Sequence, residues 1–151
     1  MFLFFLSAFS LGLEAGYGEP AINFNNLNAG PGLAIFVRKD FGISDISFMF
    51  QTDFYQGKNT GYSFSLYGMS VAFSKTRWRF SPLIEFGADY ISRGIKNAKE
   101  SGYVFAYGLG ILVNFQIERL HLYPIFSYDG ITDFRKQAGF LGFRLGIDYE
   151  M

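Results

Sequence analysis

The feature that most constrains the fold of this chain is a two-residue alternation of bulky apolar side chains with small or polar ones. Successive side chains of a β-strand point to opposite faces of a sheet, whereas a helix repeats every 3.6 residues. No segment keeps a helical period, so the pattern predicts an all-β protein. Between residues 102 and 116, one parity holds only apolar residues, namely Tyr103, Phe105, Tyr107, Leu109, Ile111, Val113 and Phe115.

Eight alternating segments divide the chain, and the gaps between them alternate in length. The gaps after odd-numbered segments are mostly long and rich in Gly, Asn and Lys, whereas the others are tight turns. Long outer loops, short periplasmic turns and an even strand number are typical of outer-membrane barrels. The chain of 151 residues suits one domain, so it predicts an eight-stranded antiparallel up-and-down transmembrane β-barrel. The segments are 10–19, 32–39, 45–55, 61–74, 79–92, 102–116, 120–129 and 138–151.

The segment at 61–74 breaks the alternation. Its first half places Phe64 and Leu66 on one parity, and its second half places Tyr67, Met69 and Phe73 on the other. A β-bulge inserts one extra residue into a strand and thereby shifts its parity. We therefore expect a bulge near Leu66–Tyr67 that restores one continuous apolar face.

The positions of the lysines indicate which face meets lipid. All six lie in turns, in loops or at strand ends, whereas a soluble sheet scatters lysines along its wet face. The apolar faces carry the bulky aromatic residues, as membrane girdles do, and the small polar faces suit the narrow lumen of eight strands. A soluble lipocalin-like ligand-binding barrel is the alternative, and it requires the aromatic face to point inwards. The lysines are Lys39, Lys58, Lys75, Lys96, Lys99 and Lys136.

The few charged residues inside the segments are predicted to face the lumen and to form a polar network there. Buried charges must pair with one another or lose their charge. We expect a structural plug that keeps the lumen shut, and a gated ion path is the alternative. These residues are Glu14, Arg38, Asp53, Glu85, Asp89, Arg144 and Asp148.

The N-terminus reads as a signal peptide at residues 1–10, followed by a barrel domain at residues 11–151. Residues 2–6 form an apolar core, and Ala8-Phe9-Ser10 resembles a cleavage site. A positively charged start is missing, so the natural start is expected upstream. An early first strand is the alternative.

Composition excludes several functions. Formal net charge is zero, which removes the bulk electrostatic case for nucleic acid. Cysteine is absent, so a cysteine zinc site and a disulfide framework are excluded. We expect neither metal nor cofactor.

The whole pattern resembles small outer-membrane barrels of the outer-membrane protein A and X type. The last eight residues, Arg144 to Met151, are similar to the signal that barrel-assembly machinery reads: polar, x, Gly, x, x, hydrophobic, x, hydrophobic. Gly146, Tyr149 and Met151 occupy its defining positions, with Met in place of the usual Phe. The resemblance implies the assembly machinery as a partner during insertion.

A second resemblance is to the lipid A 3-O-deacylase family. It rests on the segment Ser81–Gly87, on Gly108-Leu109-Gly110 and on a Gly-rich last strand. The family's His-x-Ser-Asn motif matches Ile125-Phe126-Ser127-Tyr128, so Ser127 takes the nucleophile position while the histidine is replaced. His121 lies six residues away, roughly 20 Å along a strand, and a serine nucleophile needs a base within about 3 Å.

Cationic clusters at the two rims suggest contacts with lipid headgroups. Arg93, Lys96 and Lys99 crowd the third outer loop and are candidates for binding lipopolysaccharide phosphates. At the opposite rim, Trp78 is expected to anchor the interface among Lys75, Arg77 and Arg79.

The sequence therefore predicts a monomeric, non-catalytic protein of the bacterial outer membrane. Its expected role is envelope support or surface contact through the outer loops. The alternatives are a deacylase-like hydrolase without its catalytic base and the soluble barrel.

Overall fold

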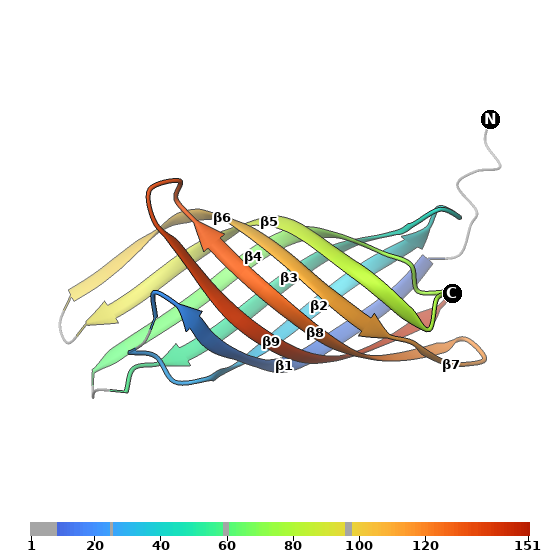
Figure 1. The fold of residues 1–151 in the computed structure, drawn as a ribbon, viewed down its shortest axis with the longest axis horizontal. Coiled ribbons are helices and arrows are strands. Elements are labelled where there is room, and N and C mark those ends of the chain that lie inside the picture. Colours follow the sequence, from blue (N-terminus) through green and yellow to red (C-terminus); the bar gives the residue numbers. More distant parts are fainter. Residues whose placement is uncertain (1–8, 25, 59–60, 96–97) are drawn as a thin grey trace.

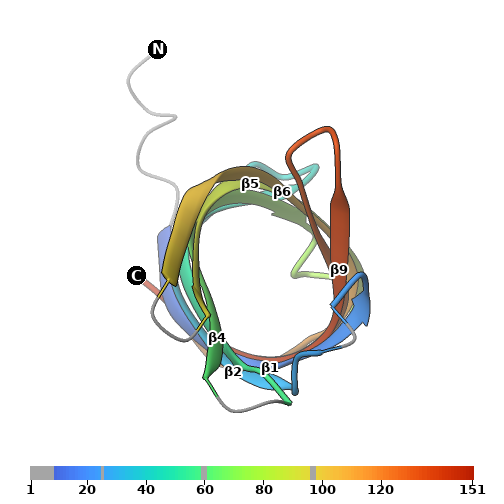
Figure 2. The ribbon, with the colours of Figure 1, turned by 90° about the vertical axis from the view of Figure 1, so that its left-hand side faces the viewer.

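A computed structural model describes residues 9–24, 26–58, 61–95 and 98–151, which form a single antiparallel sheet closed into a barrel (Figures 1 and 2). The order in the sheet is β6-β5-β4-β3-β2-β1-β9-β8-β7, and β6 also pairs with β8, which closes the ring. Among the described residues, no helix is long and apolar enough to cross a membrane. The strands are β1 (Phe9–Ile22), β2 (Gly30–Asp40), β3 (Asp45–Gln56), β4 (Tyr62–Ser74), β5 (Phe80–Ile95), β6 (Ala98–Val113), β7 (Phe115–Ile117), β8 (Leu120–Thr132) and β9 (Gln137–Glu150).

The short strand β7 continues β6 along the same partner, so the barrel has eight strands, and the predicted fold class is confirmed. Both β6 and β7 pair with β8, and only Asn114 separates them. There the backbone N–H of Asn114 donates to the carbonyl of Arg79 at 2.8 Å, and its side-chain amide donates to the carbonyl of Trp78 at 2.6 Å. The strand is interrupted because the β4–β5 turn takes its hydrogen bonds at this residue.

The two ends of the barrel differ, and we call them the loop end and the turn end. The loop end carries the connections β1–β2, β3–β4, β5–β6 and β8–β9, and the turn end carries β2–β3, β4–β5, β7–β8 and the C-terminus (Figure 1). The expected difference in length holds for β1–β2, whereas the strands β5, β6, β8 and β9 extend into the gaps that the sequence assigned to long loops. Strand β1 begins at Phe9, and Ser10 pairs with Arg38 and Glu150. The expected signal peptide therefore overlaps β1 by two residues. Residues 1–8 lie outside the described part, and cleavage stays a prediction.

The expected third outer loop at 93–101 is instead a protruding hairpin made by the ends of β5 and β6 (Figure 1). Arg93 pairs with Glu100, and Gly94 pairs with Lys99. Strand β8 ends at Thr132, opposite Phe105, so the part of β6 before Phe105 pairs only with β5. The alternation stops near residue 92 because the hairpin extends past β8, where residues 98–101 are exposed on both faces, although backbone hydrogen bonds continue the strands.

The bulge expected near Leu66–Tyr67 is absent. The pairings of β4 with β3 and with β5 run without a shift through Leu66 and Tyr67. Phe64 and Leu66 point into the lumen, where they are 0% and 4% exposed, whereas Tyr67 and Met69 point outwards. The apolar parity changes because the lumen itself is apolar at the loop end.

The outer surface is apolar, which contradicts the soluble lipocalin-like alternative. Bulky residues from every wall strand face outwards, and Phe48 is 65% exposed, Phe80 64% and Met69 68%. Soluble monomers rarely expose a large continuous apolar surface of this kind. The aromatic face therefore points outwards, as the lysine positions predicted.

Two apolar clusters occupy the lumen, one towards each end. Buried rings fill the loop-end cluster, with Tyr55 and Phe140 stacked at 4.7 Å between centroids, and Phe24 packed on Phe64 at 4.8 Å. The β1–β2 loop adds Leu27 to it. The loop-end cluster is Leu27, Tyr55, Phe64, Leu66, Ile91, Ala106, Ile131, Ala138 and Phe140. The turn-end cluster is Ala34, Phe36, Met49, Ala72, Leu83, Leu112, Tyr123 and Ile125.

We expect Phe64→Ala to lower the free energy of unfolding by about 3–5 kcal/mol, because it leaves a cavity inside a closed barrel. Phe48→Ala is the matched control on the outer face of β3, where detergent or lipid fills the space, so we expect a clearly smaller loss. Urea unfolding in detergent micelles, followed by gel mobility, measures both. Equal losses would contradict the inward position of Phe64.

Candidate functional site in the barrel lumen

The centre of the lumen holds one guanidinium group among carboxyl groups from three other strands. Arg144 of β9 lies 3.3 Å from Glu14 of β1, 3.5 Å from Glu85 of β5 and 3.6 Å from Asp129 of β8. Alternation along each strand turns these side chains inwards. Barrel closure then brings together residues as far apart in sequence as Glu14 and Arg144.

Further carboxyl groups face the same space without a cation of their own. Asp53 and Asp89 line the central cavity of about 50 Å³, together with Arg144 and its three partners. Asp89 is 2% exposed, and its Oδ1 has no hydrogen-bond partner within the described part of the chain. One guanidinium therefore faces five carboxyl groups in a nearly closed space, where unpaired charge is costly.

Serine hydroxyl groups donate hydrogen bonds to two of these carboxyl groups. Ser70 Oγ donates to Glu85 Oε1 at 2.6 Å, and Ser127 Oγ donates to Asp129 Oδ2 at 2.8 Å. No three Asp, Glu or His side chains in the described residues are arranged to hold a metal ion. What the geometry supports is a polar layer inside the barrel wall.

A second polar layer lies nearer the turn end and centres on Arg38. Its guanidinium binds Asp148 at 2.6 Å, Tyr123 Oη at 2.9 Å and Ser47 Oγ at 3.2 Å. The same group lies 4.8 Å from the centre of the Tyr123 ring, a cation–π contact. Gly146 leaves room for that ring, because a Cβ there would meet it at 2.1 Å.

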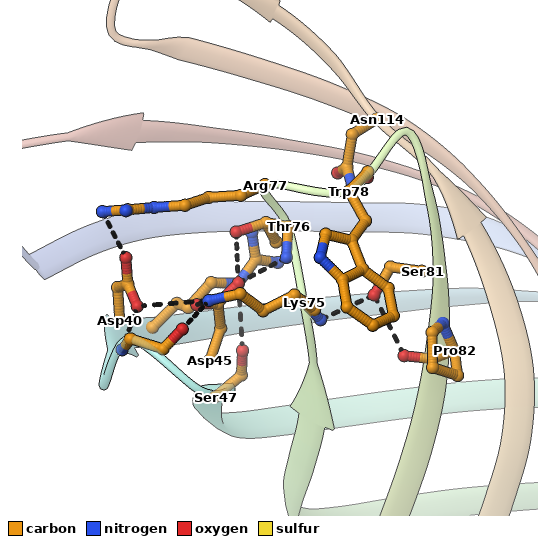
Figure 3. A network of polar contacts seen from close by, with 12 residues as sticks. Asp40, Asp45, Ser47, Lys75, Thr76, Arg77, Trp78, Ser81, Pro82 and Asn114 are labelled. Carbon is orange, nitrogen blue, oxygen red and sulfur yellow. Dashed lines mark hydrogen bonds and ion pairs between the residues drawn. The ribbon is translucent and has the colours of Figure 1, made fainter.

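A third polar network ties the β2–β3 and β4–β5 turns together at the turn end (Figure 3). Asp45 is fully buried and accepts hydrogen bonds from the backbone N–H and the hydroxyl of Thr76. Arg77 pairs with Asp40 at 2.6 Å, and Ser81 Oγ accepts the N–H of Lys75 at 2.6 Å. These bonds hold the β4–β5 turn against the β2–β3 turn.

The seven charged residues expected in the lumen all face it, but they form two layers rather than one network. Glu14, Asp53, Glu85, Asp89 and Arg144 line the central cavity, whereas Arg38 and Asp148 form the second layer. An ion path would have to displace both apolar clusters. Sequence reasoning missed Asp129, although its spacing of two from Ser127 places it on the same inward parity.

Ser127 has a carboxylate but no imidazole beside it in the part of the chain that the structure describes. Its hydroxyl donates to Asp129, and His121 lies six positions along β8, where Nε2 is 3.9 Å from Glu150. In the family's motif a histidine activates the serine nucleophile. Here the Ser127 hydroxyl contacts a carboxylate instead. The resemblance to lipid A deacylases stays a prediction.

The other candidate residues occupy the two rims. Arg93 and Lys99 lie on the protruding hairpin, and Lys96 lies outside the described residues. Tyr149 and Met151 are half or more exposed at the end of β9, and Trp78 is exposed on the β4–β5 turn (Figure 3). Recognition of Gly146, Tyr149 and Met151 by assembly machinery stays a prediction.

Solved structures share this fold, although no family model and no curated protein matches the chain. Neisserial surface protein A matches with a TM-score of 0.67 and 12% identity, over 95% of this chain and 97% of that one. Ail, the attachment invasion locus protein of Yersinia pestis, matches with a TM-score of 0.66 and 14% identity, over 96% of this chain and 99% of that one. The N-terminal β-barrel domain of Pseudomonas aeruginosa OprF matches with a TM-score of 0.61 and 10% identity, over 93% of this chain and 97% of that one. The chain has the fold of small outer-membrane barrels.

We expect Arg144→Gln to lower the free energy of unfolding by about 3–5 kcal/mol, because it leaves buried carboxyl groups without their cation. Chemical denaturation in micelles at neutral pH, with gel mobility as the readout, measures the change.

Asp89→Asn is the matched control in the same cavity and has the opposite expected sign. It removes a carboxyl group that lacks a cation, so the barrel should keep or gain stability, with the advantage growing as the pH rises and more carboxyl groups ionise. A loss as large as that of Arg144→Gln would contradict the charge imbalance.

Proposed function

We propose that this protein is a non-conducting barrel of the bacterial outer membrane that supports the envelope and makes surface contacts through its loop end. The observation that carries the proposal is the combination of an apolar outer wall with a lumen filled at both ends. A hydrocarbon environment requires that every backbone polar group be bonded internally, and the closed sheet meets this requirement.

The contents of the lumen support the proposed absence of conduction. Stacked rings close the loop end, and Arg38 with the turn-end cluster closes the other end. The remaining central cavity of about 50 Å³ has room for a few water molecules only. A structural role is therefore favoured over a pore.

The loop end is proposed to face outwards. It carries the longest connection, residues 23–29, and the extended hairpin of β5 and β6, and the outer side of such barrels carries the longer loops. The barrel-assembly machinery is the proposed partner during insertion, and lipopolysaccharide is the proposed neighbour of the loop end. The proposed state is a monomer.

Surface contact is assigned to the hairpin of β5 and β6, which extends beyond its neighbours (Figure 1). It presents Lys99, Tyr103 and Arg93 outside the barrel wall, and Tyr103 is 81% exposed. Among the solved structures with this fold, Ail is named as an attachment protein and is also seen in complex with the heparin analogue sucrose octasulfate. A sulfated glycan is accordingly the first ligand to test.

In planar bilayers, we expect the folded protein to show no steady ion conductance, because the lumen clusters exclude a continuous water path. A general porin in the same bilayer is the positive control, and a folded band that shifts on heating in detergent gels verifies insertion-competent protein. Stable single-channel currents would refute the sealed lumen.

Shortening the hairpin by removing residues 92–95 and 98–101 should leave the heat-modifiable barrel intact and abolish binding of cells to a heparin-coated surface. The matched control is Lys58→Gln, an exposed cation on the β3–β4 connection. Unchanged binding by the shortened barrel, or equal binding to an uncoated surface, would count against a glycan-contacting hairpin.

A further inference from the structure

The β8–β9 turn holds a large aromatic side chain out of the barrel on a strained backbone. Phe134 is 87% exposed and has a φ of 66°, which is unusual for a bulky residue. Its N–H donates to Thr132 Oγ1 at 2.9 Å, and the hydroxyl of Thr132 donates to the carbonyl of Lys136 at 3.1 Å. The turn is therefore built to present this ring, and such strain is commonly retained where function requires it.

Asp133 organises the rest of the turn through its carboxylate. Asp133 Oδ1 accepts the backbone N–H of Lys136 at 2.7 Å and of Arg135 at 2.9 Å. These two hydrogen bonds hold the pKa of Asp133 below its usual value. The carboxylate thus stays ionised and fixes the backbone from which both cations project.

The cations beside the ring are available to an external anion. Arg135 and Lys136 are both exposed, and no carboxylate of the described residues lies within the 4.0 Å of an ion pair with either side chain. In Figure 2, the β8–β9 turn lies outside the ring of strands. Two cations against one ordered carboxylate leave the turn with an excess of positive charge.

The ring of Phe134 continues the aromatic surface that faces the membrane. It stacks on Phe105 with 6.3 Å between centroids, and Phe105 in turn stacks on Phe86 at 6.3 Å and on Tyr107 at 6.5 Å. Phe105 and Phe86 belong to the outward parity of β6 and β5. An aromatic group at the edge of such a surface lies where acyl chains meet headgroups.

We propose that Phe134, Arg135 and Lys136 form a docking site for the anionic headgroup of a membrane lipid. Phe134 enters the boundary between acyl chains and headgroups, and the two cations contact the phosphate immediately above it. Continuity with the membrane-facing rings and charge complementarity favour a lipid over a protein. The site is separate from the cations of the hairpin, and it rests on the membrane location in the proposed function.

The test uses the full chain in lipid nanodiscs with a single indole at the site. In the background Trp78→Phe, the substitution Phe134→Trp reports on contact with lipids brominated in their acyl chains. We expect quenching that is stronger when the brominated lipid is phosphatidylglycerol than when it is phosphatidylcholine. Arg135→Gln and Lys136→Gln should each reduce this preference about fivefold, since a cation near an anionic membrane surface contributes on the order of 1 kcal/mol.

Two controls separate the possible failures. Lys58→Gln, on another connection, should leave the preference unchanged. Native mass spectrometry of the unsubstituted barrel should also retain more phosphatidylglycerol than the Arg135→Gln, Lys136→Gln double variant. A barrel that enters nanodiscs but shows an unquenched indole, or equal quenching by both lipids, would overturn this site alone. A barrel that never enters nanodiscs would overturn the proposed function.

Discussion

Closure of the sheet through the pairing of β6 with β8 is the constraint on which the rest of the molecule depends. In hydrocarbon, an open strand edge would leave a row of N–H and C=O groups without partners, and each would cost several kcal/mol. Closure removes both edges and turns one parity of every strand inwards. The chain then has two very different surfaces, an apolar wall against lipid and a narrow interior that its own side chains must fill.

That narrow interior explains the distribution of residue sizes and charges. Tyr123 lies over Gly146, and Phe36 occupies the space that a Cβ on Gly12 would take, so large rings and glycines face each other across neighbouring strands. Charged groups are tolerated where closure places a partner beside them, as with Arg38 and Asp148. The central layer departs from this balance, and its surplus of carboxyl groups is held between two apolar clusters that exclude most water.

The contrast between a filled interior and an apolar outer wall limits the places where this protein can bind other molecules. A filled lumen leaves the loop end and the apolar outer wall as the places for specific contacts, and connecting loops commonly carry binding residues. Two separate structural features lie there, the extended hairpin of β5 and β6 and the ordered turn that carries Phe134. The first reaches into solvent, while the second lies against the membrane-facing rings of Phe105 and Phe86.

Period-two alternation and the positions of the lysines determined the all-β class, the eight strands and the outward aromatic face, because these properties depend on local spacing alone. The same local pattern wrongly predicted a bulge at Leu66–Tyr67, ended β5 too early and began β6 too late. Local spacing does not show that rings from β3, β4 and β9 meet inside the lumen. It also does not show that backbone hydrogen bonds between β5 and β6 continue where the alternation ends. Only the closed tertiary structure decided that Glu14, Glu85 and Asp129 share Arg144, because those contacts depend on register across strands distant in sequence.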